Sequence, residues 1–456
     1  MEQKSNEQEN KMGVMSEGKL LLNMSLPMMI SMLVQALYNI VDSIFVSRIS
    51  EDALTAVSLA FSLQTFMIAI AAGTGVGVNA LVSRALGEKN QKRVNVVATN
   101  GIFVYILSYI FVAVMGLLVV RPFYQFQINP GQENIMEIGV EYLTIVMVGS
   151  FGIFAQFIFE RLLQATGRTF FTMISQMVGA VINLIFDPIM IFGLFGCPRL
   201  GIAGAALATI LGQIVAAIVA IIWNIKKNHD IQFEIKGFRP DGKIIGDIYK
   251  IAVPSIIMQS IGSIMTTGMN QILMGINSTA TAVFGIYFKL QSFFFMPVFG
   301  LNNGLIPIIS YNYGARKKKR MLNTLKYGYL IAFILTFIGF IGFMLIPETL
   351  LGLFSASKEM LKIGVPALRK ISFHYLLAWY CIITLSFFQA LGKAMYSLYV
   401  SVARQLVVLL PVAFILSTIG GLSLIWWCFP IAELMSCAIS TVCLVLVNKK
   451  ILNNMS

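Results

Sequence analysis

The stretch AGTGVGVNALVSRALGEKNQKR (residues 72–93) has a second copy later in the chain, FGLNNGLIPIISYNYGARKKKR (residues 299–320). The two copies are 227 positions apart and align without a gap. Matched positions are Gly73 with Gly300, Gly77 with Gly304, Ser83 with Ser310, and Gly87 with Gly314. The same offset pairs Pro27 with Pro254 and SLQTF (62–66) with KLQSF (289–293). The chain therefore consists of two related halves.

The composition is that of a membrane protein. Of the 456 residues, 57% are hydrophobic and only 12% are charged, about half the charged fraction of a soluble domain. Apolar runs of about 20 residues, each long enough to cross a bilayer, recur along the chain. We predict an all-α polytopic membrane protein with twelve spans, near 20–46, 53–86, 95–120, 134–165, 168–193, 201–225, 247–275, 280–312, 322–346, 364–391, 394–417 and 422–447.

The positive charges indicate the orientation of these spans. The net charge is +13, and the Lys and Arg residues gather in alternate loops such as GEKNQKR (87–93) and ARKKKR (315–320). Loops rich in Lys and Arg stay in the cytoplasm, so we expect both termini to be cytoplasmic. A topology signal explains these basic loops, and we expect no nucleic-acid partner.

The longest polar connection divides the chain into two bundles. We predict a disordered cytoplasmic tail (1–18), an N-lobe of six spans (19–226), a cytoplasmic linker (227–246) and a C-lobe of six spans (247–456). Both halves begin on the same side of the membrane, so the repeat is parallel. Two parallel-repeat six-helix bundles, related by an axis along the membrane normal, are typical of transporters that bind substrate between or within the bundles.

The segment INLIFDPIMIFG (182–193) carries charge inside a span. An ionised carboxylate in hydrocarbon is costly and is usually functional. Asn183 and Asp187 are four residues apart and share one helical face. Pro188 cannot donate a hydrogen bond to the carbonyl of Leu184 and kinks the helix there. An amide oxygen, a carboxylate and a freed carbonyl therefore gather at one level of the membrane.

Two further oxygen-bearing residues complete this set. Asp42 lies in the first span and Thr209 in the sixth. An all-oxygen set suits a hard cation such as Na⁺, and desolvated neighbouring carboxylates can instead hold a proton. The alternative is that these residues are buried polar groups that hydrogen-bond neighbouring helices.

The chain resembles the MATE (multidrug and toxic compound extrusion) family over nearly all its length. The resemblance rests on SLPMMISMLVQALYNIVDSIFVSRI, GTGVGVNALVSRALGEKN, LLQATG, NLIFDP, GAALAT and FGLNNGLIPIISYNYGARK, in that order and spacing. It implies export of organic, often cationic and lipophilic, compounds by alternating access, coupled to entry of Na⁺ or H⁺. We expect a monomer of the bacterial cytoplasmic membrane without a cofactor. The resemblance also implies that Asp42, Asn183, Asp187 and Thr209 form the N-lobe cation site, lined by Tyr38.

Five residues are candidates for the substrate path. Glu160 either faces the cavity and attracts cationic drugs or is a solvated or paired charge at the membrane rim. Gln64 and Gln291 occupy equivalent positions and either line the central cleft or bond neighbouring helices. Gln259 stands in the C-lobe where some branches of the family place an acid, and Met269 is the repeat partner of Asp42.

Other functions are less well supported by the residues. A lipid-linked oligosaccharide flippase of the same superfamily needs a strongly cationic cavity, whereas the spans carry mainly apolar residues and the acids Asp42, Glu160, Asp187 and Glu433. A narrow metabolite exporter remains an alternative. The spans hold no HExxH, paired-Asp or Ser/His arrangement, so we do not expect an enzyme. The expected partners are organic cations, the coupling cation and membrane lipids.

Overall fold

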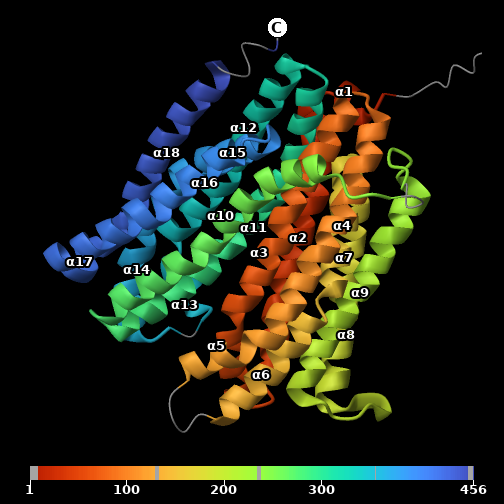
Figure 1. The fold of residues 1–456 in the computed structure, drawn as a ribbon. Coiled ribbons are helices and arrows are strands. Elements are labelled where there is room, and N and C mark those ends of the chain that lie inside the picture. Colours follow the sequence, from red (N-terminus) through yellow and green to blue (C-terminus); the bar gives the residue numbers. More distant parts are fainter. Residues whose placement is uncertain (1–8, 129–132, 234–237, 355, 450–454, 456) are drawn as a thin grey trace, which may run out of the picture.

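The computed structural model describes residues 9–128, 133–233, 238–354, 356–449 and 455. Within these ranges the chain forms helices joined by short connections, and no strand occurs (Figure 1). Helices satisfy all their backbone hydrogen bonds internally, which lipid requires of any segment that crosses it. The predicted all-α membrane fold is confirmed.

The first half of the chain builds the N-lobe. Its helix α6 and helix α7 form one span bent by 40°, at Gly149 and Ser150, residue types at which helices commonly kink. The long helices are α2 (Glu17–Ser47), α3 (Glu51–Gly87), α4 (Gln91–Leu118), α6 (Glu133–Val148), α7 (Phe151–Ala165), α8 (Thr169–Phe192) and α9 (Gly201–Lys227), with short α5 (Val120–Gln127) and η1 (Leu194–Gly196) between them.

The second half repeats this order as the C-lobe. The pair α14 and α15 is bent by 51° and corresponds to the bent pair of the N-lobe. The helices are α10 (Gly242–Met274), α11 (Ser278–Gly314), α12 (Lys318–Leu345), α13 (Pro347–Gly352), α14 (Lys358–Ser372), α15 (Tyr375–Ala390), α16 (Ala394–Val402), η2 (Ala403–Leu409), α17 (Leu410–Leu424), η3 (Ile425–Trp427) and α18 (Cys428–Val447).

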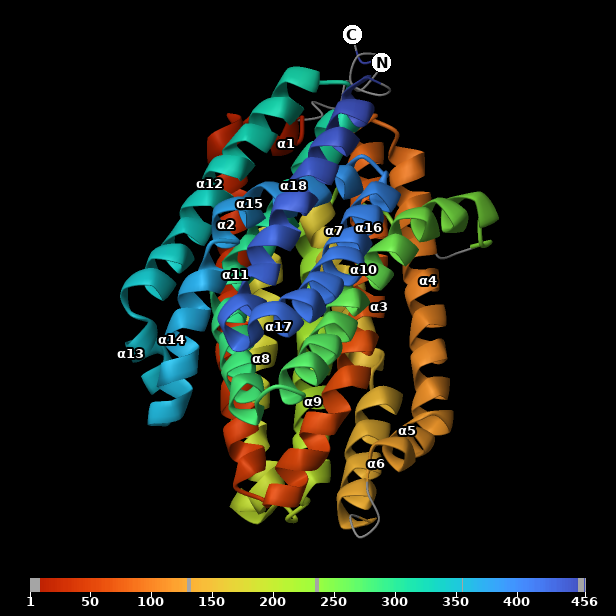
Figure 2. The same cartoon turned by 90° about the vertical axis from the view of Figure 1, so that its left-hand side faces the viewer.

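These helices supply twelve spans. Among the described residues, nine helices are long and apolar enough to cross a membrane, and the two bent pairs bring the number to 11. The last of the nine, residues 394–447, has 54 residues and would measure about 81 Å if straight, far more than the hydrocarbon thickness of about 30 Å. Gly421 breaks it with a φ of 55°, and α18 returns alongside η2 (Figure 2). The segment therefore crosses twice.

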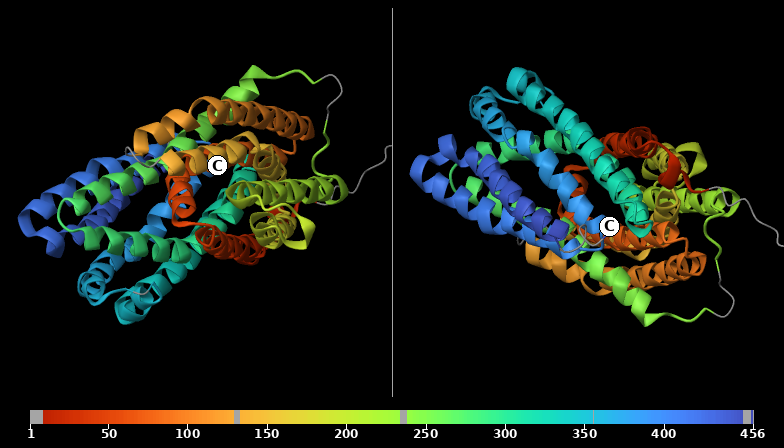
Figure 3. Two further views of the ribbon diagram at one scale, coloured as in Figure 1. Left: turned by 90° about the horizontal axis from the view of Figure 1, so that it is seen from below. Right: turned by 90° about the horizontal axis from the view of Figure 1, so that it is seen from above.

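The two lobes lie side by side, as the views along the helices show (Figure 3). They meet through α2, α3, α10 and α11, and they diverge away from the end that carries both chain termini (Figure 1). We call the end with the termini and the loops 87–93, 166–168 and 315–320 the basic end.

Matched glycines of the repeat set the lobe contact. A Cβ added at Gly73 would lie 2.6 Å from Cγ1 of Ile256, and one added at Gly300 would lie 2.6 Å from Cα of Met29. Gly73 and Gly300 are repeat partners, and so are Met29 and Ile256. Each lobe thus presents the same glycine to the same position of the other lobe, as a two-fold axis between parallel repeats requires.

The tail differs from the sequence-based expectation in part. Residues 1–8 lie outside the described residues, but residues 9–18, expected to be disordered, form α1 (Lys11–Val14) and the first turn of α2. Met12 is fully buried against the C-lobe, and its carbonyl accepts from Asn312 Nδ2 at 3.2 Å. An apolar side chain that fills a core site and a satisfied carbonyl explain why this polar segment is ordered.

The tail contacts both lobes at the basic end. Asn10 Nδ2 donates to the carbonyl of Thr166 in the N-lobe at 3.2 Å, and Lys317 Nζ in the C-lobe donates to the carbonyl of Gly13 at 3.0 Å. Lys317 also pairs with Glu9 and lowers the pKa of that carboxyl. The segment 9–16 therefore bridges the lobes.

Placing a charge at Met12 should release this bridge. In Met12→Asp a carboxyl group would occupy an apolar site without a partner, and even an uncharged polar group costs about 2–7 kcal/mol in such a site. We expect trypsin to cleave after Lys11 many times faster than in the parent protein. Val14→Asp is the matched control, because Val14 is 58% exposed on the same helix. Equal cleavage rates in the two variants would show that Met12 does not anchor the tail.

Candidate cation site and substrate path

Residues from three N-lobe helices meet at the predicted cation site. Asn183 and Asp187 lie one turn apart on α8 and are buried. The Asn183 amide nitrogen lies 3.3 Å from Asp187 Oδ1 and 3.3 Å from Thr209 Oγ1, which belongs to α9. In the flipped amide orientation, the nitrogen donates to Asp187 Oδ2 at 3.2 Å and the oxygen accepts from the Thr209 N–H at 3.2 Å. Asn183 therefore donates to Asp187 in both orientations.

Asp42 brings a second carboxyl to this cluster from α2. Its carboxyl lies next to that of Asp187 and interacts with it electrostatically. The Oδ1 atom of Asp42 is buried and has no hydrogen-bond partner among the described residues. Two carboxyl groups in contact repel each other unless they share a proton or another cation, and a buried acceptor without a partner is costly. A shared proton or cation would relieve both the repulsion and the missing partner.

Two tyrosines and a glutamine surround the carboxyl pair. Tyr38 lies one turn before Asp42 and close enough to interact electrostatically with both carboxyls. Tyr142 of α6 interacts with the same two groups and with Tyr38, and its hydroxyl accepts from Gln64 Nε2 at 3.0 Å. Gln64, predicted to line the substrate path, therefore extends this cluster. No sequence motif singles out Tyr142, which follows the exposed Glu141 on α6.

The donor set fits a proton directly and Na⁺ after one adjustment. Among the described residues no group of three or more His, Cys, Asp or Glu side chains is placed to hold a metal ion. A Na⁺ ion that uses the Asn183 oxygen as a ligand would need the flipped amide orientation, which places that oxygen 3.3 Å from Asp187 Oδ1. A shared proton is compatible with either orientation.

Glu160 lies in a separate network of the N-lobe. It is 2% exposed, so neither a solvated charge nor a position at the rim describes it. Its Oε1 accepts from Gln156 at 2.9 Å and from Ser175 at 2.8 Å, and its Oε2 accepts from Gln176 at 2.6 Å. Gln176 is 11 residues before Asp187 on α8, about 16 Å along the axis. Glu160 therefore ties α7 to α8 at a different level from the carboxyl pair.

Removing the Glu160 carboxylate should destabilise the N-lobe. Glu160→Ala would leave the half-buried Gln156 and Gln176 amides without this acceptor, whereas Ser175 keeps the Thr172 carbonyl. We expect the free energy of unfolding to fall by about 3 kcal/mol. Glu160→Gln keeps one acceptor oxygen and should lose less. Thermal unfolding of the purified protein measures both, with Glu137→Ala on the exposed face of α6 as control. A midpoint for Glu160→Ala equal to that of the control would contradict this role.

The remaining substrate candidates lie in the C-lobe. Gln291 is half-buried on α11. Gln259 is half-buried on α10 and turns its amide back to the Ser255 carbonyl at 3.4 Å. Met269 differs from the expectation, because it is fully buried in the C-lobe core. The repeat partner of Asp42 thus packs as an apolar side chain and does not line a cavity.

The C-lobe has a buried polar cluster of its own. Arg404 Nη1 lies 3.3 Å from Glu433 Oε2, and His374 Nδ1 lies 3.9 Å from the same oxygen. His374 Nε2 also meets the Tyr287 hydroxyl at 3.0 Å. Glu433 is 4% exposed and pairs with Arg404, whereas no Lys, Arg or His in the described part of the chain forms an ion pair with Asp42 or Asp187. The buried acids that lack such an ion pair therefore belong to the N-lobe.

Twelve spans in two parallel six-helix bundles, with a carboxyl pair inside one bundle, define a multi-pass membrane transporter. The model of the MatE family matches residues 27–189 and 254–415, two segments related by the offset of 227. The chain belongs to this family, whose members are transporters and not enzymes.

Relatives and solved structures agree with this assignment. The chain is 26% identical over 416 residues to a multidrug export protein MepA of Staphylococcus haemolyticus, covering 91% of this chain and 90% of that protein. It is 27% identical over 431 residues to a MepA of Staphylococcus aureus, covering 94% and 93%. Its fold matches an outward-facing multidrug resistance MATE family transporter with a TM-score of 0.90 and 24% identity, covering 97% and 99% of the two chains.

Proposed function

We propose that the protein is a secondary antiporter that exports organic, lipophilic cations in exchange for Na⁺ or H⁺. The Asp42–Asp187 pair carries this proposal, because one buried oxygen of Asp42 lacks a partner and two touching carboxyls need a shared cation. The relatives' names as multidrug export proteins support the substrate class.

Ion binding would act on the lobe through α2. Asp42 on α2 lies next to the carboxyl of Asp187 on α8. When a cation or proton occupies the pair, the two carboxyls attract a common charge and α2 is held against α8. When the pair is empty, their repulsion favours separation of the helices. A cationic drug in the N-lobe would compete for the same negative charge, which couples its release to entry of the ion.

The loop charges indicate how the protein is oriented in the membrane. We assign the basic end to the cytoplasm of a bacterial cell, as the positive-inside rule requires. The lobes are packed together at this end through the matched glycines and diverge at the other (Figure 1). This arrangement suits the state that releases substrate outward. One chain contains both lobes and the carboxyl pair, so we propose that it works as a monomer.

Gradient-driven transport tests the proposal. The purified protein would be reconstituted into liposomes loaded with a fluorescent organic cation, and a Na⁺ gradient or a pH gradient would be imposed. We expect one of the two gradients to drive dye movement and thereby to name the coupling ion. If neither gradient drives dye movement, the antiporter proposal is rejected. Movement of a labelled lipid precursor would then favour the flippase, and exchange of one small metabolite would favour the narrow exporter.

A further inference from the structure

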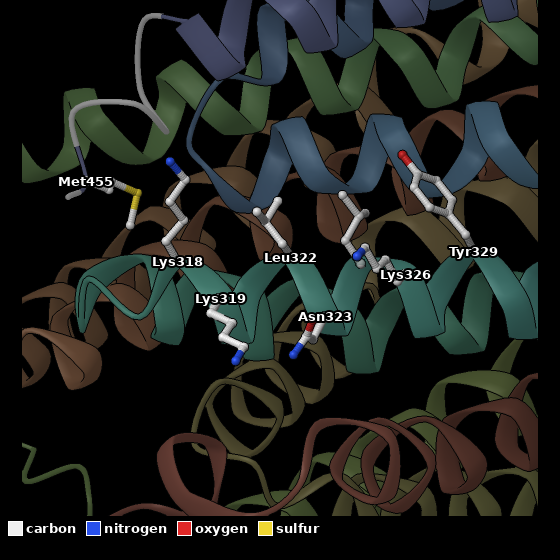
Figure 4. A pocket seen from close by; sticks show the side chains of 8 residues that line it. Lys318, Lys319, Leu322, Asn323, Lys326, Tyr329 and Met455 are labelled. Carbon is white, nitrogen blue, oxygen red and sulfur yellow. The ribbon is translucent and has the colours of Figure 1, made fainter.

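A groove with a basic lip and an apolar floor lies at the basic end of α12 (Figure 4). It encloses about 700 Å³. Its basic lip consists of Lys318, Lys319 and Lys326, of which Lys318 points toward Met455 and Lys319 toward the opposite side of α12 (Figure 4). Its other lining residues are Leu322, Asn323, Leu325, Tyr329 and Met455. We call it the α12 groove.

The three lysines of the groove carry uncompensated charge. Their neighbours Lys317 and Arg320 pair with Glu9 and Glu17 of the tail. Among the described residues, no acid forms an ion pair with Lys318, Lys319 or Lys326. The groove therefore favours an anion.

The repeat partner of this surface in the N-lobe is built differently. Gln91, Lys92 and Thr99 stand at the positions of the three lysines, so one cation replaces three. The linker covers this face, because Gln91 donates to the Asp230 carbonyl at 2.8 Å and the Gln232 N–H donates to Asn95 at 3.0 Å. In the C-lobe, Leu322 stands where Asn95 would bind such a segment.

The floor of the groove continues into the membrane as an aromatic surface. Tyr329 is fixed by a hydrogen bond of 2.7 Å to Thr384 and by stacking on Tyr380 with ring centroids 5.5 Å apart. Phe333 follows one turn later on α12, contacts the Trp379 ring at 5.7 Å and is 36% exposed. A soluble anion would not contact this apolar surface, whereas an acyl chain would pack against it.

We propose that the α12 groove binds an anionic phospholipid of the cytoplasmic leaflet. The positive charges of Lys318, Lys319 and Lys326 attract its phosphate to this end of α12, and an acyl chain lies along Leu322 and Tyr329. Lysines clustered at the cytoplasmic end of a span attract anionic headgroups, by about 1 kcal/mol for each Lys near the membrane surface. This site depends on the proposed orientation of the chain in the membrane but not on antiport. A negative transport assay would therefore leave the lipid site untouched.

Native mass spectrometry of the purified protein with added lipids tests the site. We expect the parent protein to retain phosphatidylglycerol in preference to phosphatidylcholine of the same acyl chains. The triple variant Lys318→Gln/Lys319→Gln/Lys326→Gln should bind phosphatidylglycerol about ten- to a hundredfold more weakly. Leu322→Asn, which installs the N-lobe residue, should weaken lipid binding while all three lysines remain.

The control removes the same charge from the same end of the N-lobe. Lys89→Gln/Lys92→Gln/Lys226→Gln replaces three exposed lysines and should leave the preference unchanged. An equal loss in this control would reduce the effect to the net charge of the basic end and overturn the proposal. Displacement of the lipid by glycerol phosphate at similar concentration would reveal a site for soluble phosphates instead.

Discussion

Replacing Asp187 with Asn should lower the rate of gradient-driven efflux by about a hundredfold or more. The variant keeps the shape of the side chain and its contact with Asn183 but loses the charge that a Na⁺ ion or a proton requires. Removing one partner of a buried ion pair, here the carboxylate that faces the bound cation, typically costs 3–5 kcal/mol, or about two to four powers of ten in cation binding. Dye efflux from proteoliposomes under the effective gradient is the measurement.

The same assay distinguishes coupling from folding. Asp42→Asn should fail in the same way, and the double variant should be no worse than either single one, because the two carboxyls act as one unit. Asp247→Asn is the matched control, since that acid lies in the first turns of α10 beside Lys250 at the basic end. Full coupled efflux by Asp187→Asn would remove the carboxyl pair from the mechanism.

Much of this fold could be predicted from the sequence, because the repeat and the apolar runs are long-range signals that need no side-chain detail. The offset of 227 predicted which glycines correspond, and the structure places Gly73 and Gly300 at equivalent lobe contacts. The tail was mispredicted for a local reason. Its polar composition suggested disorder, whereas a single buried Met12 and the basic residues of the C-lobe hold it.

The candidate site was predictable where chemistry and spacing coincide. Asn183 and Asp187 lie on one face of one helix, and an intramembrane acid is informative by itself. Tyr142 was missed because its place beside the carboxyl pair depends on how α6 packs against α3. That packing cannot be read from a periodic pattern in the sequence. The burial of Met269 was missed because its equivalence to Asp42 in the repeat does not predict which side chains face a cavity.

The second large effect is expected at the glycine pair that closes the basic end. A Cβ at Gly87 would overlap the Tyr311 carbonyl, and one at Gly314 would overlap the Arg84 carbonyl. Tyr311 and Arg84 are repeat partners, so the two contacts are copies. Gly87→Val should therefore force α3 away from α11. Overpacking costs about 1–3 kcal/mol, which disfavours the closed basic end about 5- to 150-fold.

Spin labels measure this shift directly. With the five native cysteines replaced, labels at Lys92 and Lys319 report the separation of the lobes at the basic end, because both side chains are exposed. Gly87→Val should widen the distance distribution and slow transport, whereas Gly285→Ala on α11 should change neither, since a Cβ there meets nothing within 4 Å. An unchanged distance distribution in Gly87→Val would mean that the glycine pair does not control closure. A widened one would show that alternating access depends on a contact that only residues without a side chain permit.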